Sequence, residues 1–206
     1  EESGWNCAVL GQKSYNGVAL LSKHEIEDVT KGLPTIEDEQ ARYIEALILS
    51  DTPIRVGGLY LPNGNPAPGP KYDYKMEWMD ALERHARELL KLDEAFVLCG
   101  DYNCIPTPAD CWDETVWQDD ALALPQTRAE FRKLKYLGLA DSFELTDNRA
   151  HQYTFWDYQG GAFKKDHGIR IDHLLCSPQA CDRLQSVEIY RKARELEKPS
   201  DHVPVI

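Results

Sequence analysis

The strongest chemical signal in this sequence is a carboxylate and an amide, Asp101 and Asn103, placed two residues apart. They follow the short apolar run 95–99, which is typical of a strand buried on both faces. Residues i and i+2 of an extended chain point to the same side, so both side chains can face one small site. Gly100, just before them, allows close approach of backbone or ligand. The alternative is a turn that merely ends the strand, a common use of Asp and Asn.

Two segments nearer the C-terminus carry acid and imidazole groups. Asp201 and His202 are adjacent, and each can bind a metal or carry a proton, although a solvated turn is an equally good reading. Asp172 is embedded in an apolar run, and a buried carboxylate is costly unless it is paired. Its partner is either a structural cation such as Arg170 or a catalytic imidazole such as His202, whose charged form it would stabilise.

Aromatic and loop residues offer weaker signals. The segment 154–158 (TFWDY) contains Phe155 and is unusually aromatic, which fits either ordinary core packing or an apolar wedge against distorted DNA. Tyr60 and Asn63 stand where a strand leads into the Gly/Pro-rich loop 62–70. Loop residues at strand ends are well placed for substrates, and both side chains could hydrogen-bond a phosphate oxygen.

The periodicity of apolar residues predicts the elements that position these groups. An apolar stripe at helical spacing predicts a helix over 72–92, and a second helix is expected over 127–136, ended by Gly138. Because strands outnumber helices, with helices inserted between some of them, the pattern favours a layered α/β sandwich. Strands are expected at 17–21, 43–49, 54–61, 95–99, 153–158, 169–176, 187–191 and 203–206.

Length and composition limit the class of protein. A chain of 206 residues, 42% of them hydrophobic, suits one globular domain over residues 1–206, and no apolar run approaches the roughly 20 residues that cross a bilayer. Six cysteines without a CxxC pair indicate buried, reduced thiols rather than disulfides, and hence a cytoplasmic protein. The net charge of −12 argues against indiscriminate nucleic-acid binding. It does not exclude a nuclease that clusters carboxylates around a divalent cation.

The order of seven motifs carries a family resemblance. In chain order, GQKSYNGVALLSK, LYLPNG, GDYNC, LADSF, YTFWDY, GIRIDHLL and KPSDHVPV resemble the exonuclease III branch of the endonuclease/exonuclease/phosphatase family. YTFWDY and GIRIDHLL look specifically like abasic-site endonucleases. The resemblance implies a four-layer α/β sandwich with two mixed β-sheets flanked by helices, and Mg²⁺ or Mn²⁺ bound by oxygen ligands. It implies an exodeoxyribonuclease III with abasic-site endonuclease activity in base excision repair.

The resemblance also implies roles for the polar residues. Asp101 would orient or deprotonate the attacking water, and Asn103 would hold that water or the developing phosphorane. His202, supported by Asp172, would contact the scissile phosphate, as would Tyr60. The residues implied to bind metal are Asp101, Asn103, Asp201 and His202.

DNA contacts are implied in the same way. The expected partner is double-stranded DNA with abasic sites or 3′ ends, bound by a monomer. Residues that grip the DNA backbone in the family match Tyr15, Arg42, Asn63 and Arg170, and those that line the pocket for an extruded abasic sugar match Phe155, Ile169 and Ile171.

The sequence departs from the family at its ends. The family's first strand carries an Asn and its next motif a Glu metal ligand, and both positions match upstream of the residues present here, with no LQE-like segment among the first residues. The fold is therefore expected to be incomplete at the N-terminus and in its last strand. The isolated chain should therefore bind metal poorly. Two other functions stay open: a phosphatase or phosphodiesterase of the same fold acting on a non-DNA substrate, and a non-catalytic nucleic-acid-binding module.

Overall fold

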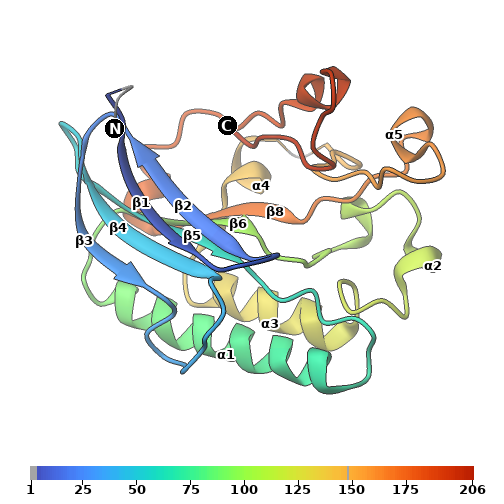
Figure 1. Ribbon diagram of the computed structural model, residues 1–206, viewed down its shortest axis with the longest axis horizontal. Coiled ribbons are helices and arrows are strands. Elements are labelled where there is room, and N and C mark those ends of the chain that lie inside the picture. Colours follow the sequence, from blue (N-terminus) through green and yellow to red (C-terminus); the bar gives the residue numbers. More distant parts are fainter. Residues whose placement is uncertain (1–3, 148) are drawn as a thin grey trace.

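The computed structural model describes residues 4–147 and 149–206, which form two β-sheets flanked by helices (Figure 1). The small sheet is an antiparallel hairpin of β1 (Asn6–Gly11) and β2 (Gly17–Ser22). The large sheet has the strand order β3-β4-β5-β6-β8-β7. Its strands are β3 (Glu25–Lys31), β4 (Tyr43–Leu49), β5 (Ile54–Tyr60), β6 (Phe96–Asp101), β7 (Ala140–Asp141) and β8 (Asp172–Cys176).

Two long helices and several short ones connect these strands. The long ones are α1 (Pro70–Leu90) and α3 (Pro125–Tyr136), and both begin with a proline, whose fixed φ suits the first turn of a helix. The short helices are α2 (Glu114–Trp117), α4 (Ser142–Thr146), α5 (Ala162–Lys165) and α6 (Pro178–Cys181), with single 3₁₀ turns at η1 (Pro108–Asp110) and η2 (Arg191–Glu195).

The register of the central strands decides which residues meet. β5 and β6 are parallel, joined by the α1 crossover, while β6 and β8 are antiparallel, so the large sheet is mixed. In this register Tyr60 of β5 pairs with Asp101 of β6, and Asp101 pairs with Asp172 of β8. The sheet therefore places three candidate site residues side by side, where these central strands begin or end, although they come from distant parts of the chain.

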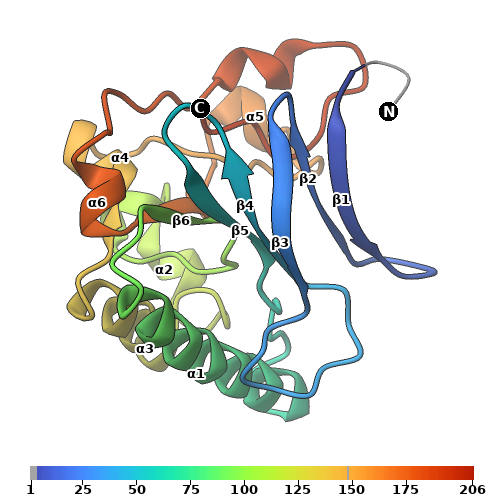
Figure 2. The same cartoon turned by 90° about the vertical axis from the view of Figure 1, so that its left-hand side faces the viewer.

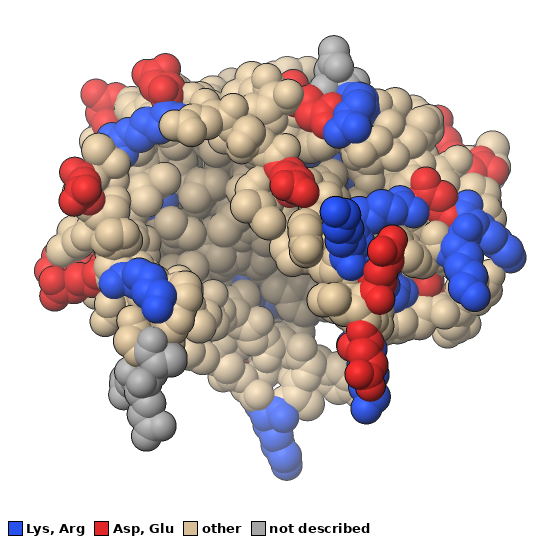
Figure 3. All heavy atoms as spheres, turned by 90° about the horizontal axis from the view of Figure 1, so that it is seen from above, with Lys and Arg blue, Asp and Glu red and all other residues tan. Residues whose placement is uncertain are grey.

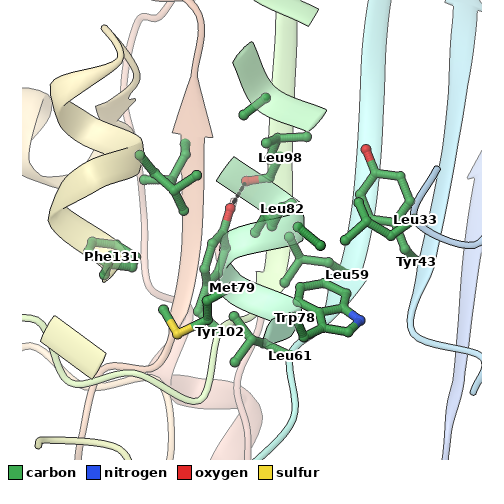
Figure 4. Close-up of a cluster of buried hydrophobic side chains, with 14 of the residues drawn as sticks. Leu33, Tyr43, Leu59, Leu61, Trp78, Met79, Leu82, Leu98, Tyr102 and Phe131 are labelled. Atoms are coloured by element: carbon green, nitrogen blue, oxygen red, sulfur yellow. Dashed lines mark hydrogen bonds between the residues drawn. The ribbon is translucent and has the colours of Figure 1, made fainter. Parts of the chain in front are cut away.

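One face of the large sheet is covered by α1 and α3 (Figure 2). The core between them contains Leu59, Leu98, Trp78 and Tyr102, all at most 3% exposed (Figure 4). The Tyr102 hydroxyl donates to the Leu98 carbonyl at 2.9 Å, a bond drawn in the close-up. Because Tyr102 turns into this core, its neighbours on either side can turn toward the sheet edge.

The β1–β2 hairpin packs on the opposite face, over β4 and β5. Ala8 and Leu20 of the hairpin are buried in one cluster with Ile44 and Ala46 of β4. Seen from above, this side of the molecule is hollowed (Figure 3). The hairpin therefore covers the β3–β5 half of the large sheet and leaves the half formed by β6, β8 and β7 without this cover.

Most elements agree with the sequence-based expectations. The α/β fold with two sheets is confirmed, as are the two long helices and the strands at 17–21, 43–49, 54–61 and 95–99, within a few residues at each end. The small sheet is antiparallel rather than mixed. The expected strands at 153–158, 187–191 and 203–206 are wrong: these segments make only the isolated bridges Phe155↔Ile169, Phe155↔His202 and Ile189↔Val205.

Three strands, β1, β3 and β7, have no counterpart among the expected ones. Most side chains of β1 and β3 are exposed and give little apolar periodicity, and β7 is only two residues long. Within the described residues, no helix is long and apolar enough to cross a membrane.

Candidate active site

The candidate site is centred on Asp101, at the end of the central strand β6. Gly100 adopts φ +142°, and a Cβ there would lie 1.9 Å from the carbonyl oxygen of Leu59. Only glycine therefore allows β6 to approach β5 closely enough to set Asp101 beside Tyr60. One Asp101 oxygen accepts the backbone N–H of Asn103 at 2.7 Å, and the other accepts its side-chain amide at 3.1 Å. The predicted convergence of Asp101 and Asn103 is thus present.

Asn103 is buried and fixed from several sides. Its amide nitrogen also donates to the Leu61 carbonyl at 2.9 Å, and its side-chain oxygen accepts from the Asn63 amide at 3.1 Å. Beneath it, the fully buried Lys75 ammonium donates to the Asn103 carbonyl at 2.6 Å and to the Asn63 carbonyl at 3.0 Å. These bonds hold the amide in one orientation.

Asp172 and His202 form the second pair of the site. A carboxylate oxygen of Asp172 lies 2.8 Å from Nδ1 of His202. Burial opposes charge on the imidazole, but the hydrogen bond and the negative charge of Asp172 outweigh it and raise the His202 pKa to about 9. This pKa favours the charged imidazole at neutral pH, and of the two partners considered for Asp172 the structure shows His202.

The electrostatics of the site favour a bound cation. Burial, followed by the charge of Asp172, raises the pKa of Asp101 to about 7. Among the residues that the structure describes, the cavity is lined by four carboxylates and by one cationic side chain, His202; the carboxylates are Asp101, Asp120, Asp157 and Asp201. A positive ion placed among them would relieve this repulsion.

A cavity of about 290 Å³ unites most of the predicted residues. Its walls come from the strand edges, from the 62–70 loop, from the segment around α2 and from the two C-terminal segments. Its lining consists of Tyr60, Asn63, Asn65, Asp101, Asn103, Trp117, Asp120, Leu122, Phe155, Asp157, Ile169, Ile171, Asp201 and His202. A separate cavity of about 400 Å³, beside Glu144 and Arg149, shares none of these residues.

Arg42 and Tyr15 lie outside the cavity lining. The Arg42 guanidinium stacks 5.0 Å from the centre of the Tyr60 ring and donates to the Tyr60 carbonyl at 3.1 Å. Tyr15, in the turn between β1 and β2, is fully exposed. Both are accessible to a ligand larger than the cavity.

Arg170 is placed where a DNA contact is not possible. It is 2% exposed, and its guanidinium bonds Asp110 and Asp141 at 2.7 Å each. This burial contradicts the expectation that Arg170 grips the DNA backbone. Of the two partners left open for Asp172, the structure shows His202 and not Arg170. Its role is structural, since two buried carboxylates need a cation.

Five lining residues were not among the expected site residues: Asn65, Trp117, Asp120, Leu122 and Asp157. The amide of Asn65 donates to Asp120 at 3.0 Å, which ties the 62–70 loop to the segment after α2. No periodicity in the sequence marks these residues as part of a site, so only the structure reveals them.

The side chains of the cavity offer the oxygen ligands that suit a hard divalent cation, but they offer too few of them. Asp101, Asn103 and Asp201 offer the oxygen ligands that Mg²⁺ and Mn²⁺ prefer. Yet in residues 4–147 and 149–206 no group of three or more His, Cys, Asp or Glu side chains is arranged to hold a metal ion. The carboxylates present would leave such an ion under-ligated.

Comparison with known proteins places this site in a family of phosphoesterases. The chain matches the model of the Endonuclease/Exonuclease/phosphatase family over residues 3–202, and it belongs to that family. Enzymes of its exonuclease III and AP endonuclease branch generally depend on a divalent metal. The predicted family is thereby confirmed.

Individual relatives agree with this assignment. The chain is 31% identical over 222 residues to exodeoxyribonuclease III of Haemophilus influenzae, covering 100% of this chain and 80% of the relative. The solved structure of the 3′ phosphatase NExo from Neisseria, bound to a product DNA hairpin, is 38% identical with a TM-score of 0.94, covering 99% of this chain and 79% of that one. An AP endonuclease from Archaeoglobus fulgidus is 31% identical with a TM-score of 0.93, at the same coverage.

Proposed function

We propose that this chain belongs to a DNA-repair phosphodiesterase that cleaves duplex DNA at abasic sites and 3′ ends with Mg²⁺ or Mn²⁺. One observation carries the proposal: Asp101, Asn103 and His202, the last bonded to Asp172 behind it, open into the same cavity as an apolar wall. The polar side chains supply the groups that hydrolysis needs, and the apolar wall can recognise a sugar that has lost its base. The relatives named exodeoxyribonuclease III and AP endonuclease support this substrate class.

The polar residues divide the chemistry among them. Asp101, with a pKa near 7, is suited to take the proton of an attacking water at neutral pH. Asn103 orients that water from its fixed amide. Charged His202 donates to a non-bridging phosphate oxygen, and Asp172 positions it. Tyr60 can donate to another oxygen of the phosphate.

A divalent cation would be held by oxygens of Asp101, Asn103 and Asp201, with His202 beside it. When bound, it neutralises charge on the phosphate oxygens. Because these ligands are too few, metal affinity should be weak in residues 1–206 alone and higher in a chain extended to the length of its relatives.

The surroundings of the cavity suit duplex DNA. Phe155, Ile169 and Ile171 offer an apolar surface to a base-free sugar, and Arg42, Asn63 and Tyr15 lie where the flanking phosphates would pass. We also propose that residues 1–206 form part of a single domain that acts as a monomer. A cytoplasmic location fits the six cysteines, all free thiols.

A substrate panel tests this function against the non-DNA alternative. The extended chain is assayed with Mg²⁺ on a duplex containing one abasic analogue, on a duplex with a 3′-phosphate and on an inositol phosphate. Incision of the first duplex that yields a 3′-hydroxyl, with no release of phosphate from the inositol ester, is expected. Turnover of the inositol ester alone would contradict the proposal, and steeply salt-dependent DNA binding without turnover would favour the non-catalytic module.

A further inference from the structure

The candidate cavity has an apolar wall, and one side chain of that wall, Trp117, has no role in the proposed mechanism. Ile169, Ile171 and Leu122 belong to one buried hydrophobic cluster, and Phe155 and Trp117 pack against it half-buried. All five side chains line the cavity. Trp117 carries the largest of these side chains, and it belongs to the short helix α2, which supplies none of the catalytic or metal-binding candidates.

Trp117 is held on this wall from both sides. It ends α2, whose first residue, Glu114, pairs with Arg128 of α3 at 2.7 Å. The Trp117 carbonyl accepts the N–H of Asp120 at 2.9 Å, and Asp120 is bonded to Asn65 of the 62–70 loop at 3.0 Å. The indole is therefore part of a pre-formed boundary between two anchored segments.

The small volume of the cavity restricts the ligand that this boundary admits. At about 290 Å³ it lies at the small end of ligand pockets, which run from roughly 300 to 1,000 Å³. It must hold a phosphate and the sugar attached to it, which leaves little room for a base. We propose that Trp117 is a specificity-determining residue, which limits the apolar compartment to a sugar without a base. This inference rests on the proposed function and names the substrate that the same site prefers.

Three DNA substrates use the same catalytic groups but differ in what they place against the apolar wall. In abasic incision, water attacks phosphorus, the bond from phosphorus to the upstream 3′-oxygen breaks, and the 3′-hydroxyl leaves with a proton. The base-free sugar stays on the resulting 5′-phosphate, against the wall. In exonuclease action that sugar carries a base. In removal of a 3′-phosphate the same bond breaks, but no second sugar is attached, so the wall is not contacted.

The test is to replace Trp117 with alanine and to measure kcat/KM for all three substrates. The ratio of exonuclease to abasic-site incision should rise about tenfold, the scale at which a pocket discriminates by size. The 3′-phosphatase activity should change by less than about threefold, since the groups that stabilise the transition state are untouched. The matched control is Trp112→Ala, in the segment just before α2. Trp112 stacks on His167 at 3.7 Å between ring centroids and does not line the cavity, so the ratio should not move.

An unchanged ratio in a Trp117→Ala variant with normal phosphatase activity would overturn the inference. If this variant loses all three activities because it does not fold, Trp117→Phe takes its place. The smaller ring of phenylalanine should still raise the ratio of exonuclease to abasic-site incision by about threefold. An unchanged ratio in this variant would also overturn the inference. Absence of all three activities in the wild-type protein would instead remove the proposed function itself.

Discussion

The contact between Asp172 and His202 joins side chains 30 residues apart in the sequence at 2.8 Å. It raises the folded-state pKa of His202 to about 9 from an ordinary value of 6.5. A raised histidine pKa means that the stability from this contact is complete below pH 6.5 and is lost as the pH rises through about 9. The charged imidazole is therefore built into the fold at neutral pH.

Replacing Asp172 with asparagine should lower the His202 pKa from about 9 toward 6.5, because the negative partner is lost. An NMR titration of the imidazole in metal-free protein measures this. Asp157→Asn, which removes another carboxylate of the same cavity, should shift it less. A His202 pKa that stays near 9 in the Asp172 variant would show that another group holds the charge.

Arg170 provides a second test at the scale of single residues. Arg170→Met leaves Asp110 and Asp141 buried without their cation, so the free energy of unfolding should fall by about 3–5 kcal/mol. Urea denaturation measures this, with exposed Arg132→Met as the control. A variant of normal stability that binds DNA weakly would restore Arg170 as a DNA contact.

Residue spacing could reveal the Asp101–Asn103 pair, because alternation in an extended chain is local. The role of Arg170 could not be found in this way. Its partners Asp110 and Asp141 are 60 and 29 residues distant, and nothing in their local sequence marks them. A buried ion pair is a property of packing, which a motif does not encode.

Among the elements, β4 and α1 are joined by a buried polar cluster around Glu45. Its carboxylate accepts from the Tyr43 hydroxyl at 2.5 Å and lies 2.7 Å from Nε2 of His85 and 3.4 Å from the Arg55 guanidinium. Burial would raise the Glu45 pKa, but the hydrogen bonds from His85 and Tyr43 outweigh it and lower the pKa from 4.5. The link therefore contributes stability above pH 4.5 that is lost as the pH falls.

Glu45→Ala should destabilise the protein by about 3–5 kcal/mol at pH 7, because three buried partners lose their acceptor. The difference from wild type, measured by urea unfolding, should shrink below pH 4.5, where Glu45 takes up a proton. Glu27→Ala on exposed β3 should cost far less. Equal effects of the two substitutions would mean that the cluster does not join helix and sheet.

The long elements could be predicted because each buries one continuous apolar face. The apolar stripe of α1 and the runs of β4, β5 and β6 are local signals. The predicted strands at 153–158 and 203–206 do not form, because each segment pairs only through isolated bridges. Likewise, no sequence pattern discloses the β5–β6–β8 register that brings Tyr60 and Asp101 together.

For the whole molecule, the net charge of −12 opposes DNA, and binding must rely on few basic contacts and on the cation. Arg42, stacked on Tyr60 beside the cavity, is one such contact. Arg42→Ala should make the slope of log K against log salt shallower by about 1, the loss of a single phosphate contact. Arg132→Ala, on α3 across the sheet, should leave the slope unchanged. An unaltered slope in the Arg42 variant would place DNA elsewhere.

The most direct measurement is cleavage of a duplex with one abasic analogue by the chain extended to the length of its relatives, with Mg²⁺ or with EDTA. Asp101→Asn is the paired variant. Incision 5′ to the lesion should occur with Mg²⁺, vanish with EDTA, and fall by about 10²–10⁴-fold in the variant, as expected for loss of a general base. Incision that persists in EDTA, or that the variant supports at the wild-type rate, would contradict the central place of Asp101 and its cation.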